Sequence, residues 1–287
     1  RKSMEYSITL PTCQRTITLR ELLETQWLVP RKVRHFLRTR KSVWCNQQPI
    51  KFHEMVHAND IITLRIEEDD YNYQTVKAGS KENIKVLYED EHLIVVNKTA
   101  GVKTHPNQPD ETNTLLNDLS AYLGKKNEQP YVVHRLDKET SGAILFAKNP
   151  LALPILGRLL EKKKIYRNYQ AIVWGELKQD YTIDKKIGRD RHDKRKRIIN
   201  ERQGKTAITY VKVHRVHKQT SEVYCSLATG RTHQIRVHLA SMGHPVVGDP
   251  LYQNKKEERL ALHAYKIKFL HPFTQEQIEV IAKPGLW

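Results

Sequence analysis

Short apolar runs with the length and composition of β-strands outnumber the helical patterns in this chain. Strands are predicted over residues 84–88, 93–96, 143–147, 169–174, 206–213, 222–227 and 266–269. Helices are predicted over residues 151–163, where leucines recur with helical spacing, and over residues 234–242, just before Gly243. Because strands and helices do not alternate one for one, the pattern favours an α+β domain built on a mixed sheet.

The first 67 residues have the texture of a separate small domain. Helices are predicted around residues 17–23 and 33–37, and strands over residues 43–46 and 61–66. Residues 68–83 are polar and contain an acidic run and a Gly-Ser pair, which is typical of a linker. We therefore predict one domain over residues 1–67 and a larger one over residues 84–287.

The charge balance indicates an anionic partner. The chain has 49 Lys and Arg against 32 Asp and Glu, a net charge of +17, with basic residues spread along its whole length. This distribution favours nucleic acid, and no basic amphipathic helix indicates a membrane surface. Three distant cysteines, Cys13, Cys45 and Cys225, predict neither a disulfide framework nor a thiolate zinc site. With no signal peptide or spanning segment predicted, we expect a cytoplasmic protein.

Residues 133–142 hold the most informative carboxylate of the chain. Asp137 follows His134 and Arg135, and a turn-prone tail ends at Gly142. Taken alone, the pattern is typical of an aspartate that caps or shapes a turn. A lone acid in a strongly basic chain also fits a catalytic group, and the residues of this segment leave both interpretations open.

Four ordered motifs together suggest a family. They cover residues 88–98 with Gly101 and a following His-Pro pair, residues 133–142, residues 164–175, and residues 230–239 with continuations at 243–245 and 248–252. In this order they resemble the RluA-type pseudouridine synthases, which isomerise uridine in RNA. The resemblance covers residues 84–287, and residues 1–67 resemble the S4 RNA-binding fold, although Asn59 replaces that family's usual glycine.

The resemblance implies a fold, an activity and a partner. It implies a catalytic domain with a mixed, largely antiparallel central sheet and flanking helices, preceded by a small S4-like α/β domain. It also implies a cofactor-free and metal-free monomer that acts on RNA, with large-subunit ribosomal RNA favoured over transfer RNA. The alternative is an RNA-binding or ribosome assembly factor that has lost catalysis.

The same resemblance implies catalytic roles for three residues. Asp137 matches the family's catalytic aspartate, which attacks or stabilises a transient intermediate on a flipped-out uridine. Arg236 matches the arginine that orients this carboxylate. Tyr169 matches the active-site tyrosine that stacks on the base. Tyr166 lies close enough to be confused with it, and packing in the core would explain either tyrosine.

Further residues are implied to contact substrate. Arg135 would fill the gap that the extruded nucleotide leaves, and Ile235 would line the uracil pocket, although core packing also explains an isoleucine. Arg231 belongs to the same motif and is assigned to substrate binding. His134 fits an anchor for the loop better than a chemical role.

Two basic segments are candidates for RNA backbone contacts. The predicted helix around residues 33–37 carries Arg34 and Arg38, and residues 185–205 are dense in charge, including Arg195, Lys196 and Arg197. A solvated, mobile loop is the ordinary interpretation of such a run. In a chain of this charge we interpret residues 185–205 as a loop that grips phosphates and orders on RNA.

Residues 53–57 fit the H-E-x-x-H pattern of zinc hydrolases, with His53 and His57 as the potential ligands. On a helix, both histidines would share one face. Pro49 precedes the pattern closely and Asn59-Asp60 follows it, which leaves little room for that helix. We therefore predict a strand or connector here, and no metal site.

Overall fold

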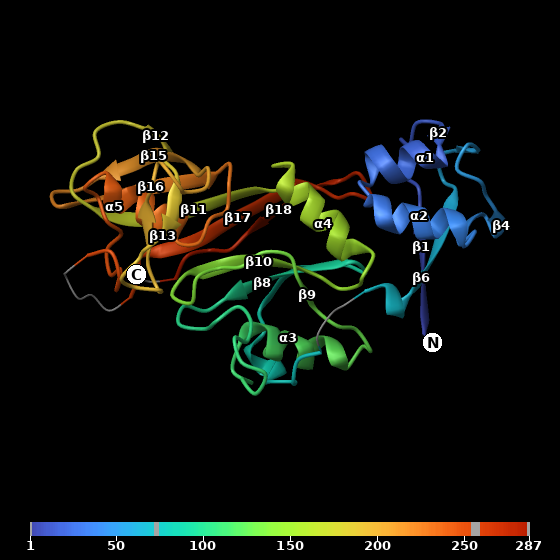
Figure 1. Ribbon diagram of the computed structural model, residues 1–287, viewed down its shortest axis with the longest axis horizontal. Helices are drawn as coiled ribbons and strands as arrows, with labels where there is room; N and C mark the ends of the chain where they lie inside the picture. Colours follow the sequence, from blue (N-terminus) through green and yellow to red (C-terminus); the bar gives the residue numbers. More distant parts are fainter. Residues whose placement is uncertain (1, 72–74, 254–258, 286–287) are drawn as a thin grey trace.

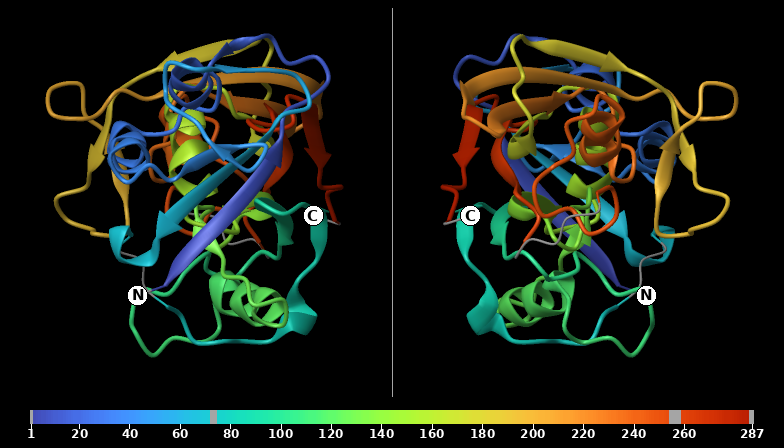
Figure 2. Two further views of the ribbon diagram at one scale, coloured as in Figure 1. Left: turned by 90° about the vertical axis from the view of Figure 1, so that its right-hand side faces the viewer. Right: turned by 90° about the vertical axis from the view of Figure 1, so that its left-hand side faces the viewer.

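The computed structural model describes residues 2–71, 75–253 and 259–285. The N-terminal strands and helices lie at one end of the long axis, and the segments around α5 (Gln234–Ser241) lie at the other (Figure 1). Between them stand α3 (Leu115–Gly124) and α4 (Ala152–Glu161). End-on views place α3 beneath the rest of the molecule (Figure 2).

The N-terminal unit is a small sheet with two short helical segments. Its elements are β1 (Ser3–Thr9), β2 (Ile17–Thr18), α1 (Leu19–Glu21), a π-helical turn (Leu22–Gln26), α2 (Arg31–Thr39), β3 (Val43–Cys45), β4 (Gln48–Pro49), β5 (Met55–Val56) and β6 (Ile61–Glu67). The sheet has the order β1-β6-β3-β4, and β2 pairs separately with β5. This arrangement is consistent with the predicted S4-like domain.

The helix predicted over residues 17–23 is wrong at its start. Ile17 and Thr18 form β2, and Thr18 then accepts a hydrogen bond from the backbone N–H of Glu21 at 3.1 Å. A threonine that caps the first turn in this way is extended itself, so the helical pattern in the sequence begins two residues too early.

The larger unit is built on a central sheet. Its strands are β7 (Val86–Glu89), β8 (Leu93–Lys98), β9 (Tyr131–Val132), β10 (Ser141–Ala147), β11 (Tyr166–Trp174), β12 (Tyr181–Asp184), β15 (Ile208–Val216), β16 (Thr220–Leu227), β17 (Leu262–Leu270) and β18 (Gln277–Ile281). The order is β12-β15-β16-β11-β17-β10-β8-β7, with β18 beside β17 and β9 beside β10.

One parallel pairing makes this sheet mixed. β10 runs parallel to β17, whereas the other strand pairs that the structure describes are antiparallel. At this crossing Gly142 lies opposite Ala264, and a Cβ on Gly142 would stand 2.2 Å from the Ala264 carbonyl oxygen. A glycine is therefore required at position 142. With one parallel pairing in an otherwise antiparallel sheet, as far as the structure describes it, the predicted α+β class with a largely antiparallel sheet is confirmed.

In the larger unit, two helix predictions are confirmed and one helix was missed. α4 and α5 fall within residues 151–163 and 234–242. α3 was not predicted, although Thr114 and Asn117 form a capping box at its start. The apolar face of α3 packs under β8 and β10. The Asp118 carboxylate of the same helix accepts the backbone N–H of Ser80 at 2.8 Å and so holds the segment that precedes β7.

The two units share buried surface. The Trp27 ring of the N-terminal unit meets Phe273 edge-on, with ring centroids 4.9 Å apart. The Arg158 guanidinium of α4 donates to the Leu28 carbonyl at 3.3 Å. One apolar cluster therefore continues from the small sheet into the large one.

The charge-dense segment 185–205, which was predicted to be a loop that grips phosphates and orders on RNA, has regular structure at its base. It contains a hairpin of β13 (Ile187–Arg189) and β14 (Arg197–Ile199), and Ile187 also pairs with Lys205. Ile187 is buried against Ala207 and Val237. This small apolar contact holds the base of the segment against the larger unit, and the density of charge in the sequence obscured it.

Candidate active site

The loop that carries Asp137 is fixed from both sides. Thr104 Oγ1 donates to the Leu136 carbonyl at 3.0 Å and accepts the Leu136 N–H at 3.2 Å. The buried Lys98 ammonium donates to the Lys138 carbonyl at 2.8 Å, and burial lowers its pKa to about 8. The aspartate therefore sits on a constrained backbone, which is what a positioned reactive group needs.

Asp137 faces Arg236 across 99 residues of sequence, and a second aspartate holds that arginine. Arg236 Nη1 donates to Asp137 Oδ2 at 3.2 Å. Its Nε and Nη2 atoms donate to the two oxygens of Asp249 at 2.9 and 2.8 Å. The Arg236 side chain is 4% exposed and that of Asp249 0%, whereas that of Asp137 is 24% exposed. The buried pair thus presents a guanidinium edge to a carboxylate that solvent and substrate can reach.

The two carboxylates determine the protonation of Arg236. Burial by itself lowers the pKa of a guanidinium. The hydrogen bonds and charges of Asp249 and Asp137 outweigh burial, so the pKa of Arg236 lies above its ordinary value. The arginine is a permanent cation here.

Strand alternation separates the two candidate tyrosines. Tyr169 is 5% exposed and lines the same small pocket as Asp137, Ile235 and Arg236. Burial raises the pKa of its phenol, which the charge of Arg167 partly opposes. Tyr166 is 43% exposed and lies outside this pocket. The structure therefore brings Tyr169, not Tyr166, to Asp137.

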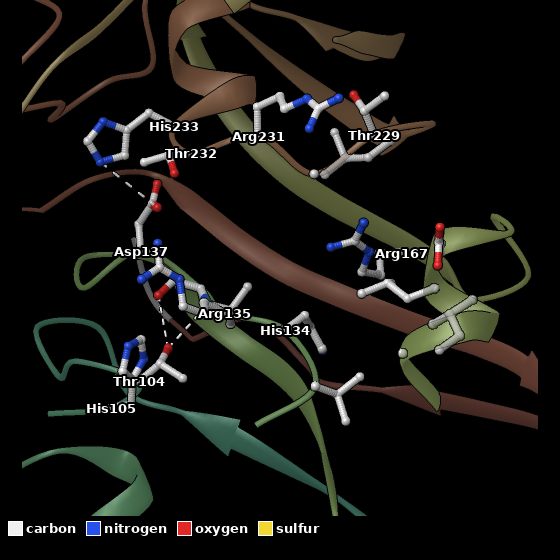
Figure 3. A pocket seen from close by; sticks show the side chains of 18 of the residues that line it. Thr104, His105, His134, Arg135, Asp137, Arg167, Thr229, Arg231, Thr232 and His233 are labelled. Carbon is white, nitrogen blue, oxygen red and sulfur yellow. Dashed lines mark hydrogen bonds and ion pairs between the residues drawn. The ribbon is translucent and has the colours of Figure 1, made fainter. Parts of the chain in front are cut away.

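A wider pocket of about 820 Å³ opens over Asp137. Arg135 is exposed beside Asp137, and Arg231 lies across the pocket, where its Nε donates to the Thr206 carbonyl at 2.8 Å. Figure 3 shows that Arg167 stands on the same far side, and that His105 lies near Arg135 (Figure 3). Arginines thus stand on both sides of the pocket, and arginine side chains are common contacts of nucleic-acid phosphates.

His233 is a site residue that the sequence interpretation missed. It precedes α5 with φ of 57°, and its Nε2 lies 4.0 Å from Asp137 Oδ1 (Figure 3). Its Nδ1 lies 2.7 Å from the Tyr252 hydroxyl, which accepts the Arg197 N–H at 2.9 Å. Burial lowers the pKa of His233. Its place inside the motif at residues 230–239 was the available signal.

His134 has the anchoring geometry that its position suggested. Its Nε2 accepts the backbone N–H of Leu145 at 3.1 Å in the interior. Burial lowers the pKa of His134 to about 3, so the ring is neutral. A neutral acceptor ties the strand before Asp137 to β10.

The other predicted RNA contacts lie away from this pocket. Arg34 donates to the Val29 carbonyl at 3.0 Å and pairs with Glu24, and Arg38 lines the same basic hollow on the N-terminal unit. In the β13–β14 hairpin, Arg195 is held by Asp193, and Arg197 donates to the carbonyls of Lys194 and Lys196. The hydrogen bond from Arg197 to Tyr252 connects this hairpin to the pocket.

The H-E-x-x-H segment is not helical. β5 occupies its centre and pairs with β2, so the strand or connector prediction is confirmed. Among residues 2–71, 75–253 and 259–285, no cluster of three potential ligands that could hold a metal ion is found. Within the same ranges, no helix is long and apolar enough to cross a membrane.

The mixed sheet, the paired aspartate and the arginine-lined pocket are those expected of a pseudouridine synthase. A sequence profile described as RNA pseudouridylate synthase matches residues 92–241, and one described as the RluD ribosomal pseudouridine synthase N-terminal domain matches residues 6–62. The chain therefore belongs to the RluA/RluD-type RNA pseudouridine synthase family.

Individual relatives agree with this assignment. The chain is 41% identical over 277 residues to YhcT of Bacillus subtilis, named an uncharacterized RNA pseudouridine synthase, covering 91% of each chain. It is 40% identical to ribosomal large subunit pseudouridine synthase D of Neisseria meningitidis, over 68% of this chain and 56% of that protein. The structure of human RNA pseudouridylate synthase domain containing 1 matches with a TM-score of 0.60 and 30% identity, over 73% of this chain and 86% of that one.

Proposed function

We propose that this protein isomerises specific uridines of large-subunit ribosomal RNA to pseudouridine, using Asp137 on a flipped-out uridine and no cofactor. The observation that carries the proposal is the 3.2 Å contact between Asp137 and the buried Arg236, which line a small pocket together with three further arginines. The ribosomal substrate is supported by relatives that are named ribosomal large subunit pseudouridine synthase D.

The chemistry breaks the bond from uracil N1 to ribose C1′ and forms one from C5 to C1′, after which C5 loses its proton. Asp137 would serve by attacking C1′, by attacking C6 or by taking a ribose proton. Each route needs a fixed carboxylate beside a cation that balances its charge, which Arg236 provides. Atoms balance within the nucleotide, so the isomerisation requires no external oxidant or reductant.

The neighbouring residues fit the steps around this reaction. Tyr169 would stack on the uracil and assist the late proton transfer from C5, and Ile235 would line the base pocket. Arg135 would occupy the gap left in the RNA stack, since it is exposed beside Asp137. Arg231 would contact the substrate from the opposite wall.

We further propose that the N-terminal unit delivers RNA as a domain of its own. The predicted divisions at residues 67 and 84 fall between the last strand of the small sheet and the first strand of the large one. Arg34 and Arg38, together with the β13–β14 hairpin, would contact phosphates. We propose a cytoplasmic monomer as the working form.

The alternative is an RNA-binding or assembly factor without catalysis. The exposed basic surfaces would serve it equally well. The buried Asp249–Arg236 pair disfavours it, because a binding protein has no need to fix a guanidinium beside Asp137. Turnover is what separates the two functions.

Asp137→Asn tests the proposal. We expect this variant to keep the affinity for RNA and to lose pseudouridine formation, because asparagine retains the shape and removes the reacting oxygen anion. The measurement is pseudouridine in transcribed large-subunit ribosomal RNA after incubation with each protein. Asp69→Asn, an exposed carboxylate in the 68–70 turn, is the matched control and should retain turnover. Turnover by Asp137→Asn would refute the assigned role.

A further inference from the structure

β11 presents two different faces. Tyr169 points to the buried side, where α5 and the active-site pocket lie. Tyr166, Asn168 and Gln170 alternate with the buried residues and face the other way. The sheet thus has an outer face, on the side of β11 opposite the pocket that Tyr169 and Asp137 line.

Aromatic rings collect on this outer face. The strand pairing places Gln170 opposite Tyr224 on β16, and Tyr224 opposite Lys212 on β15. These three side chains therefore share the outer face. The set consists of Tyr166 on β11, Tyr210 and His214 on β15, Tyr224 on β16 and Tyr265 on β17. Tyr166 and Tyr210 are 43% and 46% exposed, which is high for tyrosines within strands.

The rings are held in place by one another and by amides. Ring centroids of Tyr224 and Tyr265 lie 5.8 Å apart, and those of His214 and Tyr224 lie 5.2 Å apart. Gln170 Nε2 donates to the Tyr224 hydroxyl at 3.0 Å, and Asn168 Nδ2 donates to that of Tyr166 at 2.9 Å. Oriented rings lose little freedom when a planar partner stacks on them.

Lysines border the same rings. Lys212 and Lys268 are exposed, and Lys266 lies between β11 and β18. The nearby acids have partners: Glu279 lies 3.9 Å from Lys266, Asp180 accepts the Val213 N–H at 2.9 Å, and Glu222 lies 2.6 Å from His217. The Lys212 and Lys268 side chains are exposed, so their ammonium groups can contact phosphates.

Two hollows lie side by side on this face. One of about 660 Å³ lies over β12, β15, β16 and β11. The other, of about 680 Å³, lies between β11, β17 and the N-terminal unit at Thr25 and Leu28, and it adds Lys164. Tyr166 and Lys266 line both. The two hollows therefore meet at these two side chains, and together they extend from the far strands to the junction of the two units.

We propose that this outer face binds single-stranded RNA. The tyrosine rings stack on bases, and Lys212, Lys266 and Lys268 contact phosphates. Aromatic rings on an open sheet, bordered by cations, form a platform on which unpaired bases stack regardless of sequence. Because the platform lies on the opposite side of the sheet from Asp137, it holds a different RNA segment from the one that carries the target uridine.

Equilibrium binding of an RNA without uridine tests the platform separately from catalysis. The probe is a fluorescently labelled oligocytidine about 12 nucleotides long, and the readout is anisotropy with the full chain. We expect the double variant Tyr166→Ala/Tyr210→Ala to bind at least about fivefold more weakly, as the removal of one base stack or more predicts. Both side chains are exposed, and unchanged melting curves would verify the fold.

Two matched replacements identify the interaction. Tyr166→Phe/Tyr210→Phe keeps the rings and should bind within about twofold of wild type, whereas Tyr166→Leu/Tyr210→Leu should be as weak as the alanine variant. Wild-type affinity in the alanine or the leucine variant would overturn the proposal, because oligocytidine binding would then not depend on the aromatic rings. Lys268→Ala should reduce the salt slope by about 0.7, with Lys125→Ala at the end of α3 as the control. Pseudouridine formation by Asp137→Asn decides the proposed function independently.

Discussion

Two arginine–aspartate pairs in this protein have nearly the same geometry and opposite surroundings. Arg236 donates to Asp249 through Nε and Nη2 at 2.9 and 2.8 Å, and Arg195 donates to Asp193 through the same two atoms at 3.1 and 2.8 Å. The Arg236 side chain is 4% exposed, and that of Arg195 is 73% exposed.

Exposure to solvent, not hydrogen-bond geometry, therefore determines what such an ion pair does. In water the exposed pair is screened, and its arginine can exchange the aspartate for a phosphate. In the interior the arginine cannot leave its partner without stranding a charge, so the pair fixes the guanidinium beside Asp137. The exposed Arg195–Asp193 pair is therefore suited to attracting RNA, and the buried Arg236–Asp249 pair to holding a reacting group.

Removing the buried acid should have the largest effect. Asp249→Asn leaves Arg236 with less counter-charge in the interior, and we expect it to lower the free energy of unfolding by about 3 kcal/mol. It should also abolish turnover, because the guanidinium is no longer held toward Asp137. Denaturant unfolding measures the first effect. Asp193→Asn makes the same change in the exposed pair and should leave the unfolding midpoint where it is, so equal midpoints for both variants would break the comparison.

The difference between buried and exposed groups should also appear in how the stability of the protein depends on pH, through the buried His134. The pKa of His134 is lowered to about 3 in the folded chain, from an ordinary value of 6.5. Between these values the unfolded chain binds a proton that the folded chain does not, so stability is lost as pH falls below about 6.5. This one group should contribute a slope of up to about 1.4 kcal/mol per pH unit.

Unfolding of His134→Gln and wild type across this pH range measures that slope. The variant should be less stable than wild type at neutral pH and should lose less stability on acidification. His192→Gln, on the exposed part of the hairpin, is the control. Parallel curves for His134→Gln and wild type would show that the buried ring does not govern the acid response.

The exposed hairpin should show the smallest effect on stability. Arg195→Ala, Lys196→Ala and Arg197→Ala together should leave the melting temperature nearly unchanged, because the Arg195–Asp193 pair is exposed and the Arg197 guanidinium donates to carbonyls of its own hairpin. RNA affinity should become less dependent on salt, with the slope falling by about 0.7 to 0.9 for each RNA phosphate that the variant no longer neutralises. Binding titrations at several salt concentrations measure this slope. An unchanged slope would remove the hairpin from the RNA interface.

Local patterns were enough to predict much of the fold. Strand runs, the leucine spacing of α4 and the end of α5 were predicted because alternation and helical spacing are properties of neighbouring residues. α3 and the β13–β14 hairpin were missed. The capping box and the leucines of α3 are local signals that the sequence prediction overlooked. The hairpin depends on contacts with distant segments, as of Ile187 with Val237, and no short window of sequence contains both partners.

The sequence was enough to establish that the chain is basic, that its larger unit is an α+β domain and that Asp137 belongs to a turn-prone segment. It also supplied the motifs that indicated the family. The resemblance already favoured Tyr169 over Tyr166, whereas the nearness of His233 to Asp137 and the hold of Asp249 on Arg236 became visible in the folded chain. Pairing between distant strands sets which side of a strand is buried, and burial then gives a charge its role.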